Sequence, residues 1–257
     1  MRALILAAGR GSRMGALGDV RPKCLVELDG RPLLDRQLAA LRAGGARDIG
    51  IVRGYRKDML ERPALTYFDN DRWSETNMVM SLACAAKWLR AEPVIVSYGD
   101  IFYRGDLIRG LAAAQGELVI SYDRRWRELW TRRFADPLSD AETFRIDASG
   151  RLLEIGGKTA HIDDIQGQYM GLLKFTPPAW AAIEQLLSSL EPAVRDRLDM
   201  TGLIRRLLAA GAVTILTYGT DGQWGEIDNA GDVALYEAML ADKTLALEPV
   251  APETGAG

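Results

Sequence analysis

Histidine and cysteine are scarce in this chain of 257 residues, and their scarcity excludes several kinds of chemistry. The two cysteines, Cys24 and Cys84, do not make a disulfide framework, and we expect both to be small buried thiols in a reducing compartment. The single histidine, His161, has no cysteine cluster beside it for zinc and no partners for a nucleophilic triad. Zinc chemistry and triad chemistry are therefore not expected.

A basic surplus and a long apolar run are missing as well. The 32 lysines and arginines face 35 acidic residues, and a net charge of −3 provides no broad basic surface for nucleic acid. The apolar run at the N-terminus is too short for a membrane span or a signal peptide, since Arg10 and Arg13 follow it at once. We therefore expect a cytoplasmic protein that binds neither nucleic acid nor membrane.

Apolar residues make up 48% of the chain, enough for a sizeable core, and strands alternate with helices along most of it. The continuous apolar run 3–8 is typical of a central strand that is covered on both faces. Further strands are expected at 48–52, 93–97, 117–122 and 213–218, and helices at 32–43, 77–89, 106–114, 179–190, 200–210 and 232–240. The pattern predicts one α/β domain over 1–245, with a doubly wound, mostly parallel, mixed sheet, and a flexible tail over 246–257.

The alternation changes between residues 123 and 175. Short strand-like pieces at 144–147, 152–155 and 171–175 are separated by turns rich in aspartate, glycine and arginine. We interpret this segment as a small antiparallel extension of the main sheet that binds a second substrate.

A glycine-rich loop follows the first strand. Gly9 and Gly11 would let backbone N–H groups come close to a phosphate chain, while Arg13 and Lys23 would add positive charge. The loop is not a P-loop, since no Gly-Lys-Ser/Thr follows, and it lacks the third glycine of a dinucleotide fingerprint. An ordinary glycine-rich turn with two solvated cations is the alternative.

Two acidic residues stand out further along the chain. Asp100 follows an expected central strand, and open α/β sheets bind their ligands at the carboxyl ends of their strands. Asp228 lies far away in sequence, in Glu226-Ile227-Asp228. Taken alone, the pattern favours Asp100 as a turn residue or a helix cap over a metal ligand, because aspartate is common in such turns.

Three stretches near the N-terminus carry a resemblance: Leu-Ala-Ala-Gly-x-Gly-Ser-Arg from Leu6, Arg-Pro-Lys-Cys-Leu-Val from Arg21, and Gly-Arg-Pro-Leu-Leu from Gly30. They look like the nucleotidyltransferases that activate sugar phosphates and phosphocholine. The pattern is most similar to the CTP-dependent phosphocholine and phosphonate cytidylyltransferases, through Phe68-Asp69-Asn70, Asn77, Ser81-Leu82, Tyr98-Gly99-Asp100 and Glu226-Ile227-Asp228. The resemblance extends from residue 1 to about residue 240 and implies a Rossmann-like fold.

The resemblance also implies roles for particular residues. Asp100 and Asp228 would meet over one Mg²⁺ that touches the triphosphate, with Glu226 as a further or water-mediated ligand. CTP would lie against a set of loop and strand residues, which are Leu6, Ala7, Ala8, Gly9, Gly11, Ser12, Arg13, Lys23, Asn77, Ser81, Tyr98 and Gly99. The choice of cytosine follows from the resemblance alone.

The reaction that this implies needs no general base. A phosphate or phosphonate acceptor is already ionised near neutral pH, because its second pKa is about 6. Lys23 and Arg13 are the expected catalytic residues, which stabilise the negative charge that develops at the α-phosphoryl group.

The acceptor site is expected in the aromatic and basic stretch that follows the fourth strand. Tryptophan faces could hold an ammonium group, and arginines could bind a phosphonate or carboxylate. The candidate residues are Asp123, Trp126, Trp130, Arg132 and Arg133, together with Glu154, Lys158 and Tyr169. A solvated basic helix with two tryptophans packed on the core is the alternative. The arginines favour an acceptor with an anionic group besides its ammonium, or a phosphonate.

The leading hypothesis is a cytidylyltransferase that transfers CMP from CTP to a small phosphate or phosphonate and releases pyrophosphate. A sugar-1-phosphate nucleotidylyltransferase and a non-catalytic nucleotide-binding module are the alternatives. The sequence leaves the oligomeric state open, with a homodimer as one alternative.

Overall fold

The computed structural model describes residues 1–11 and 21–249. Its centre is a seven-stranded sheet in which one strand, β11, runs antiparallel to both of its neighbours. In spatial order the strands are β12 (Ile215–Thr220), β8 (Leu118–Asp123), β11 (Gln168–Phe175), β6 (Val94–Tyr98), β1 (Arg2–Ala7), β4 (Asp48–Arg53) and β5 (Leu65–Asp69). The expected doubly wound, mostly parallel, mixed sheet is confirmed.

Strand β1 is an interior strand of this sheet, next to the middle strand β6, and its apolar residues are covered on both faces. It is parallel to β4 on one side and to β6 on the other, and Leu6 is in register with Val52 and with Tyr98. The carboxyl ends of β1 and β6 therefore meet at one edge of the sheet. The glycine-rich loop and Asp100 follow these two ends directly.

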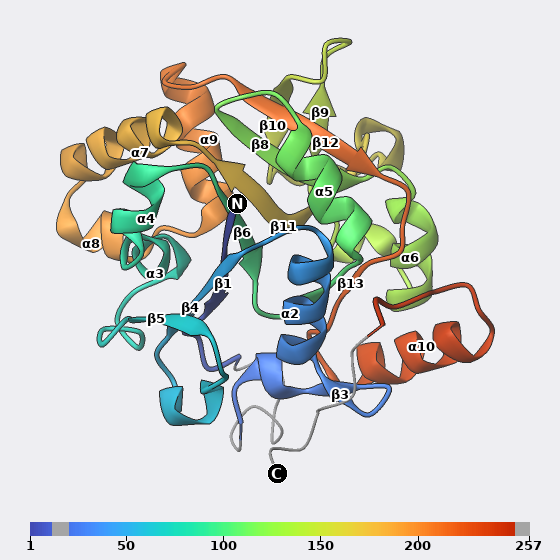
Figure 1. Ribbon diagram of the computed structural model, residues 1–257. Helices are drawn as coiled ribbons and strands as arrows, with labels where there is room; N and C mark the ends of the chain where they lie inside the picture. The colour runs from blue at the N-terminus through green and yellow to red at the C-terminus, as the bar shows by residue number, and fades with distance from the viewer. Residues whose placement is uncertain (12–20, 250–257) are drawn as a thin grey trace.

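Helices cover the sheet in two groups (Figure 1). On one side α2 packs against α5, and on the other α3 packs against α9 and α4 against α7. The helices are α2 (Leu33–Ala43), α3 (Met78–Ala83), α4 (Ala86–Ala91), α5 (Gly105–Ala113), α6 (Trp126–Arg133), α7 (Pro177–Ser189), α8 (Pro192–Asp196), α9 (Met200–Ala210) and α10 (Ala230–Ala241). Single 3₁₀ turns are η2 (Lys23–Leu25), η3 (Lys57–Leu60), η4 (Pro137–Ser139) and η5 (Ile162–Asp164).

Three small antiparallel pairs accompany the main sheet. They are β2 (Glu27–Leu28) with β3 (Arg31–Pro32), β7 (Ile101–Phe102) with β13 (Gly225–Glu226), and β9 (Phe144–Ile146) with β10 (Leu152–Ile155). Only β9 and β10 form the expected extension. The piece at 171–175 was wrongly included in it, because β11 lies in the main sheet between β6 and β8 and is buried there.

Other differences from the sequence-based expectation arise from tertiary contacts. The expected helix at 77–89 is two short helices, since the backbone leaves the helical conformation at Ala85. Cys84, which we expected to be buried, is exposed, whereas Cys24 is buried. Residues 246–249, expected in a flexible tail, are held in place where Ala246 donates to Gln223 Oε1 at 2.8 Å and Glu248 accepts from the Gly105 N–H at 2.7 Å.

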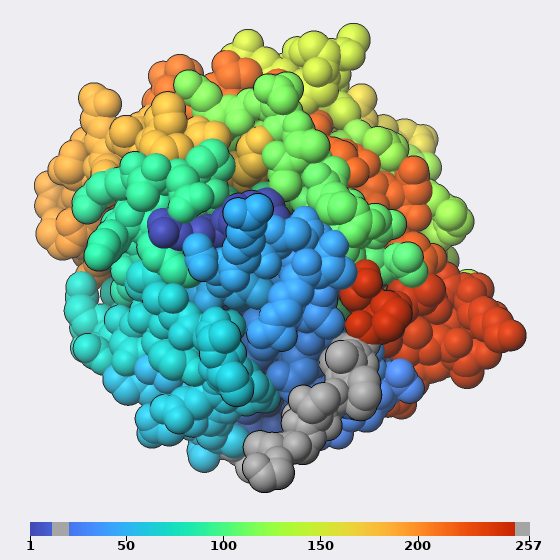
Figure 2. Space-filling view, viewed as in Figure 1, coloured from blue at the N-terminus to red at the C-terminus, as the bar shows by residue number. Residues whose placement is uncertain are grey.

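The space-filling view shows how segments far apart in sequence form one surface (Figure 2). The blue segment that carries α2 lies between the cyan segment and the green and red ones. Helix α10 contacts β2, so the C-terminal part of the chain closes against its N-terminal part. Within 1–11 and 21–249, no helix has the length and apolar character needed to cross a membrane.

Candidate active site

Three carboxylates meet at the carboxyl end of β6. Asp100, Glu226 and Asp228 each offer an oxygen, and these oxygens lie within 4.8 Å of one another. The short β7–β13 pairing brings them together, because β7 directly follows Asp100 and Glu226 ends β13. The Ile227 N–H donates to the Asp100 carbonyl at 3.0 Å and ties the two segments further.

Lys23 lies between two of these carboxylates. Its Nζ is 2.7 Å from Asp100 Oδ2 and 2.5 Å from Asp228 Oδ1. Burial alone would lower the pKa of Lys23, but the attraction of the two carboxylates outweighs it and holds the pKa above its usual value. Gly11, in the left-handed region with φ +70°, approaches so closely that an added Cβ would lie 3.0 Å from Lys23 Cβ. The glycine-rich loop thus packs directly on the lysine.

The cluster has the properties of a site for a divalent cation. Burial, and after it the negative charges of Asp100 and Asp228, raise the pKa of Glu226 to about 8. Asp100 Oδ1 is buried and, among the described residues, has no hydrogen-bond partner. Carboxylate oxygens are the ligands that Mg²⁺ prefers, so this donor set fits that ion.

A cavity of about 250 Å³ opens beside the cluster on the side of β1. The expected nucleotide-binding residues Leu6, Ala7, Gly9, Gly11, Lys23 and Gly99 line it, as do Asp100, Cys24 and Met78. A Cβ on Gly99 would lie 2.7 Å from the Leu6 carbonyl oxygen, so β1 and this turn can approach only with glycine here. Cys24 and Met78 were missed because an isolated apolar residue carries no sequence signal for a ligand.

Other residues expected to bind the nucleotide lie outside this lining. Ala8 is buried, and its carbonyl accepts from the Tyr55 N–H. Ser81 is buried and accepts from Asn70 Nδ2, while Asn77 caps α3. Ser12 and Arg13 fall in the gap between the described residues.

A second cavity of about 250 Å³ lies on the other side of the carboxylates, between the main sheet and the β9–β10 extension. Its lining is aromatic and acidic, and it comprises Tyr98, Ile101, Trp130, Asp140, Glu142, Thr143, Phe144, Ile155, Gln168, Tyr169, Met170, Gly171, Thr201 and Glu226. Glu226 belongs to both this cavity and the carboxylate cluster. A molecule bound here would therefore lie next to the cluster.

The acidic side chains of the second cavity differ in how they are bound. Asp140 accepts a hydrogen bond from Trp130 Nε1 at 3.1 Å. The half-buried carboxylate of Glu142 receives none from the residues that the structure describes, and burial raises its pKa. Neither residue was among the sequence candidates, since single acidic residues in a turn-rich segment resemble ordinary turn residues.

The expected acceptor residues are distributed over several places. Trp130 and Tyr169 line the second cavity, and Lys158 Nζ donates to the Asp140 carbonyl at 3.1 Å. Glu154 pairs with Arg145 at 3.4 Å on the exposed side of β10. The structure therefore brings two of the eight candidates into the lining of this cavity, and a third, Lys158, binds the backbone of the lining residue Asp140.

The remaining acceptor candidates lie elsewhere. Trp126 is buried, which removes its face from any ligand, and its Nε1 donates to the Ile165 carbonyl. Asp123 and Arg132 line a separate cavity of about 370 Å³ next to Trp224. Arg133 is buried behind the carboxylate cluster.

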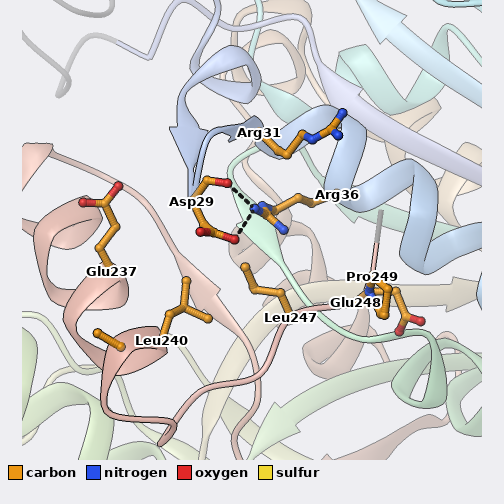
Figure 3. Close-up of a pocket in the computed structure, with 9 residues that line it drawn as sticks. Asp29, Arg31, Arg36, Glu237, Leu240, Leu247, Glu248 and Pro249 are labelled. Carbon is orange, nitrogen blue, oxygen red and sulfur yellow. Dashed lines mark hydrogen bonds and ion pairs between the residues drawn. The ribbon is translucent and has the colours of Figure 1, made fainter. Parts of the chain in front are cut away.

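A further cavity, of about 700 Å³, lies between the β2–β3 hairpin and α10 (Figure 3). Arg36 points toward Asp29 there, with Nη2 3.2 Å from Asp29 Oδ2, and also binds the hairpin carbonyls. This cavity shares no lining residue with the two cavities beside the carboxylates. Its arginine is committed to holding the hairpin.

Comparison with known proteins gives a consistent picture. Residues 3–193 match the family model described as the MobA-like NTP transferase domain. The chain is 35% identical over 256 residues to CTP:phosphoglutamine cytidylyltransferase of Campylobacter jejuni, a match that covers 91% of this chain and 98% of the relative.

Solved structures of low sequence identity share the fold. A putative glucose-1-phosphate thymidylyltransferase from Bacillus anthracis superimposes with a TM-score of 0.73 at 16% identity, covering 94% of this chain and 96% of that one. CTP:phosphocholine cytidylyltransferase from Streptococcus pneumoniae superimposes with a TM-score of 0.68 at 20% identity, covering 93% of this chain and 98% of that one.

Proposed function

The chain belongs to the family of MobA-like NTP transferase domains, and we propose that it is a cytidylyltransferase that transfers CMP from CTP to a small phosphorylated acceptor. The observation that carries this proposal is the position of Lys23 between Asp100 and Asp228, beside the glycine-rich loop. A lysine and three carboxylates at one end of the central strands suit a triphosphate with its counter-cation. The similarity to the phosphoglutamine enzyme supports CTP as the nucleotide.

In the proposed reaction an ionised phosphate oxygen of the acceptor attacks the α-phosphorus of CTP. A new oxygen–phosphorus bond forms, the bond from the α-phosphorus to the α,β-bridging oxygen breaks, and pyrophosphate leaves with that electron pair. Lys23 stabilises the charge that develops on the phosphoryl oxygens, and the N–H groups of the Gly9–Gly11 loop orient the triphosphate. Arg13 is assigned the same electrostatic role on its sequence motif alone.

Asp100, Asp228 and Glu226 are the residues that would hold Mg²⁺. When bound there, the ion would supply positive charge to the triphosphate and the leaving pyrophosphate. Two observations support this assignment: Asp100 Oδ1 is buried without a hydrogen-bond partner among the described residues, and one oxygen of each carboxylate lies within 4.8 Å of the others.

The second cavity is the proposed acceptor site. Glu142 and Asp140 suit an ammonium group, while Lys158, whose Nζ binds the carbonyl of Asp140, suits a carboxylate. A phosphorylated amino acid therefore matches this set of charges better than phosphocholine does. The similarity to the phosphoglutamine enzyme supports the same substrate class. Tyr98, which the sequence assigned to the nucleotide, lines this cavity instead and is in edge-to-face contact with Tyr169, with ring centroids 5.9 Å apart. Trp130 and Phe144 complete the aromatic part of the lining.

Pyrophosphate release tests the reaction. The purified protein is incubated with Mg²⁺ and each nucleoside triphosphate, together with phosphoglutamine, phosphocholine, 2-aminoethylphosphonate or glucose 1-phosphate. We expect the fastest release with CTP and phosphoglutamine, and a CDP-linked product of matching mass. Faster release with dTTP and glucose 1-phosphate would identify a sugar-phosphate enzyme instead, and no release with any pair would contradict catalysis.

The acceptor assignment has its own test. Glu142→Gln removes the charge that would face the ammonium group, and loss of a charged hydrogen bond of about 1.5–3 kcal/mol corresponds to a roughly 10- to 150-fold fall in kcat/KM for phosphoglutamine. KM for CTP is expected to stay unchanged. Asp163→Asn, at an exposed carboxylate outside the cavity, is the matched control. Equal kcat/KM for Glu142→Gln and the control would exclude Glu142 from the acceptor site.

A further inference from the structure

A buried ion pair lies directly behind the carboxylate cluster. Arg133, the last residue of α6, has only 1% of its side chain exposed, and Asp232, in the first turn of α10, has 5%. Arg133 Nε is 2.9 Å from Asp232 Oδ1, and its Nη2 is 3.3 Å from Asp232 Oδ2. The guanidinium lies over the rings of Trp130 and Phe134, at 5.4 and 5.1 Å from their centroids.

Both members of the pair reach the cluster. Arg133 Nη1 is 3.8 Å from Glu226 Oε2, and Nη2 is 3.7 Å from Asp228 Oδ2. Asp232 Oδ2 accepts from the Asp228 N–H at 2.8 Å and from the Asn229 N–H at 3.2 Å. The pair thus contacts the side chains of two cluster residues and the backbone of one of them.

One N–H donor of the Arg133 guanidinium has no hydrogen-bond acceptor among the described residues. Arg133 Nη1 is buried and forms no hydrogen bond with the described part of the chain, although Glu226 lies just beyond bonding distance. A buried donor without a partner is costly, and a small turn of the Glu226 carboxylate would satisfy it. Asp228 is held from two sides, because Lys23 binds its Oδ1 while Arg133 faces its Oδ2.

We propose that Arg133 and Asp232 are positioning residues that hold Glu226 and Asp228 turned toward Asp100 and thereby set the affinity of the site for a divalent cation. This inference rests on the proposed function, in which the three carboxylates bind the cation. Groups that orient metal ligands from behind typically change metal affinity about 10- to 100-fold when they are lost. Neither residue lines the nucleotide or acceptor cavity, so neither touches substrate.

Two effects of Arg133 on cation binding have opposite signs, and this makes the proposal testable. As a positive charge near the site, Arg133 repels a cation, so its removal by itself would tighten binding. As a positioning group it orients the ligands, so its removal would weaken binding. Arg133→Lys keeps the charge but loses the planar fork, and it therefore separates the two effects.

The experiment measures Mn²⁺ binding to the full chain by the loss of the free-ion signal in electron paramagnetic resonance, with and without CTP. We expect Arg133→Gln, Arg133→Lys and Asp232→Asn each to bind Mn²⁺ about 10-fold or more weakly than the wild type. Arg127→Gln, on the exposed face of the same helix, is the matched control with unchanged affinity. Urea unfolding of each variant measures fold stability separately, and Arg133→Lys and Asp232→Asn carry the test if Arg133→Gln does not fold.

The outcomes distinguish this inference from the proposed function. Unchanged or tighter Mn²⁺ binding by Arg133→Lys and Asp232→Asn would overturn the positioning role while leaving the cation site itself intact. A wild-type protein that binds no Mn²⁺, with or without CTP, would overturn the assignment of the three carboxylates and with it the inference.

Discussion

Removal of the Lys23 ammonium group is expected to separate catalysis from stability. In Lys23→Ala the charge 2.7 Å from Asp100 and 2.5 Å from Asp228 is lost, and so is the cation proposed to face the α-phosphoryl group. Loss of one preorganised electrostatic donor costs about 2.7–4 kcal/mol in the transition state, so kcat should fall roughly 10²- to 10³-fold. The measurement is the initial rate of pyrophosphate release at saturating CTP and acceptor.

In the Lys23→Ala variant, added Mg²⁺ should restore the stability of the fold but not the activity. Without metal, Lys23→Ala leaves Asp100 and Asp228 facing each other in a site where the lysine side chain is only 10% exposed, and we expect a loss on the order of 2 kcal/mol in the free energy of unfolding. Added Mg²⁺ should restore most of that loss by taking the place of the ammonium charge, whereas kcat stays low.

Two control variants accompany Lys23→Ala: one removes a lysine at an exposed position, and the other keeps a positive charge at position 23. Lys87→Ala, at an exposed position of α4, should change neither quantity. Lys23→Arg keeps a charge but changes its shape, so partial activity is expected. A Lys23→Ala variant with kcat within threefold of the wild type would refute the electrostatic role of the lysine.

Two further predictions concern packing and thiol reactivity. Gly171→Ala should lower the free energy of unfolding by roughly 2 kcal/mol or more, because Gly171 has φ +73° and an added Cβ would lie 2.5 Å from the Tyr98 ring. Gly211→Ala, at φ +59° with open space around it, should lower it by only about 1 kcal/mol. Equal urea midpoints for the two variants would contradict the clash with Tyr98. Burial raises the pKa of Cys24 to about 12, so iodoacetamide at pH 8 should label exposed Cys84 and leave Cys24 unmodified, as mass spectrometry of the tryptic peptides would show; equal labelling would refute the burial.

Much of the fold could be predicted because the hydrophobic pattern of a segment in the sequence agrees with how deeply that segment is buried in the structure. The apolar run of β1 and the period of α2 identified central elements within one residue of their observed bounds. Edge strand β5 was missed because it is only partly buried and alternates irregularly. The strands β7 and β13 were missed because two residues are too few to show a periodic pattern. Their pairing also joins segments more than a hundred residues apart, which no local pattern reveals.

The candidate site could be predicted where a residue type has a distinctive chemical role. Lys23 and the three carboxylates were named from motifs, and the structure places them together. Basic residues after β8 could not be assigned in the same way, because a charge run in sequence does not show which way each side chain points. Arg133 turned inward to Asp232, and a partner 99 residues away cannot be read from local pattern.

The sequence by itself determined the doubly wound sheet and the position of the glycine-rich loop after its first strand, because hydrophobic periodicity and short glycine motifs are local properties of the chain. Only the tertiary structure decided what surrounds the carboxylates. The pairing of β7 with β13 brings Glu226 beside Asp100, and the packing of α6 on α10 puts the Arg133–Asp232 pair behind them. These are long-range contacts, which form where complementary surfaces meet in the folded protein and leave no periodic trace in the sequence.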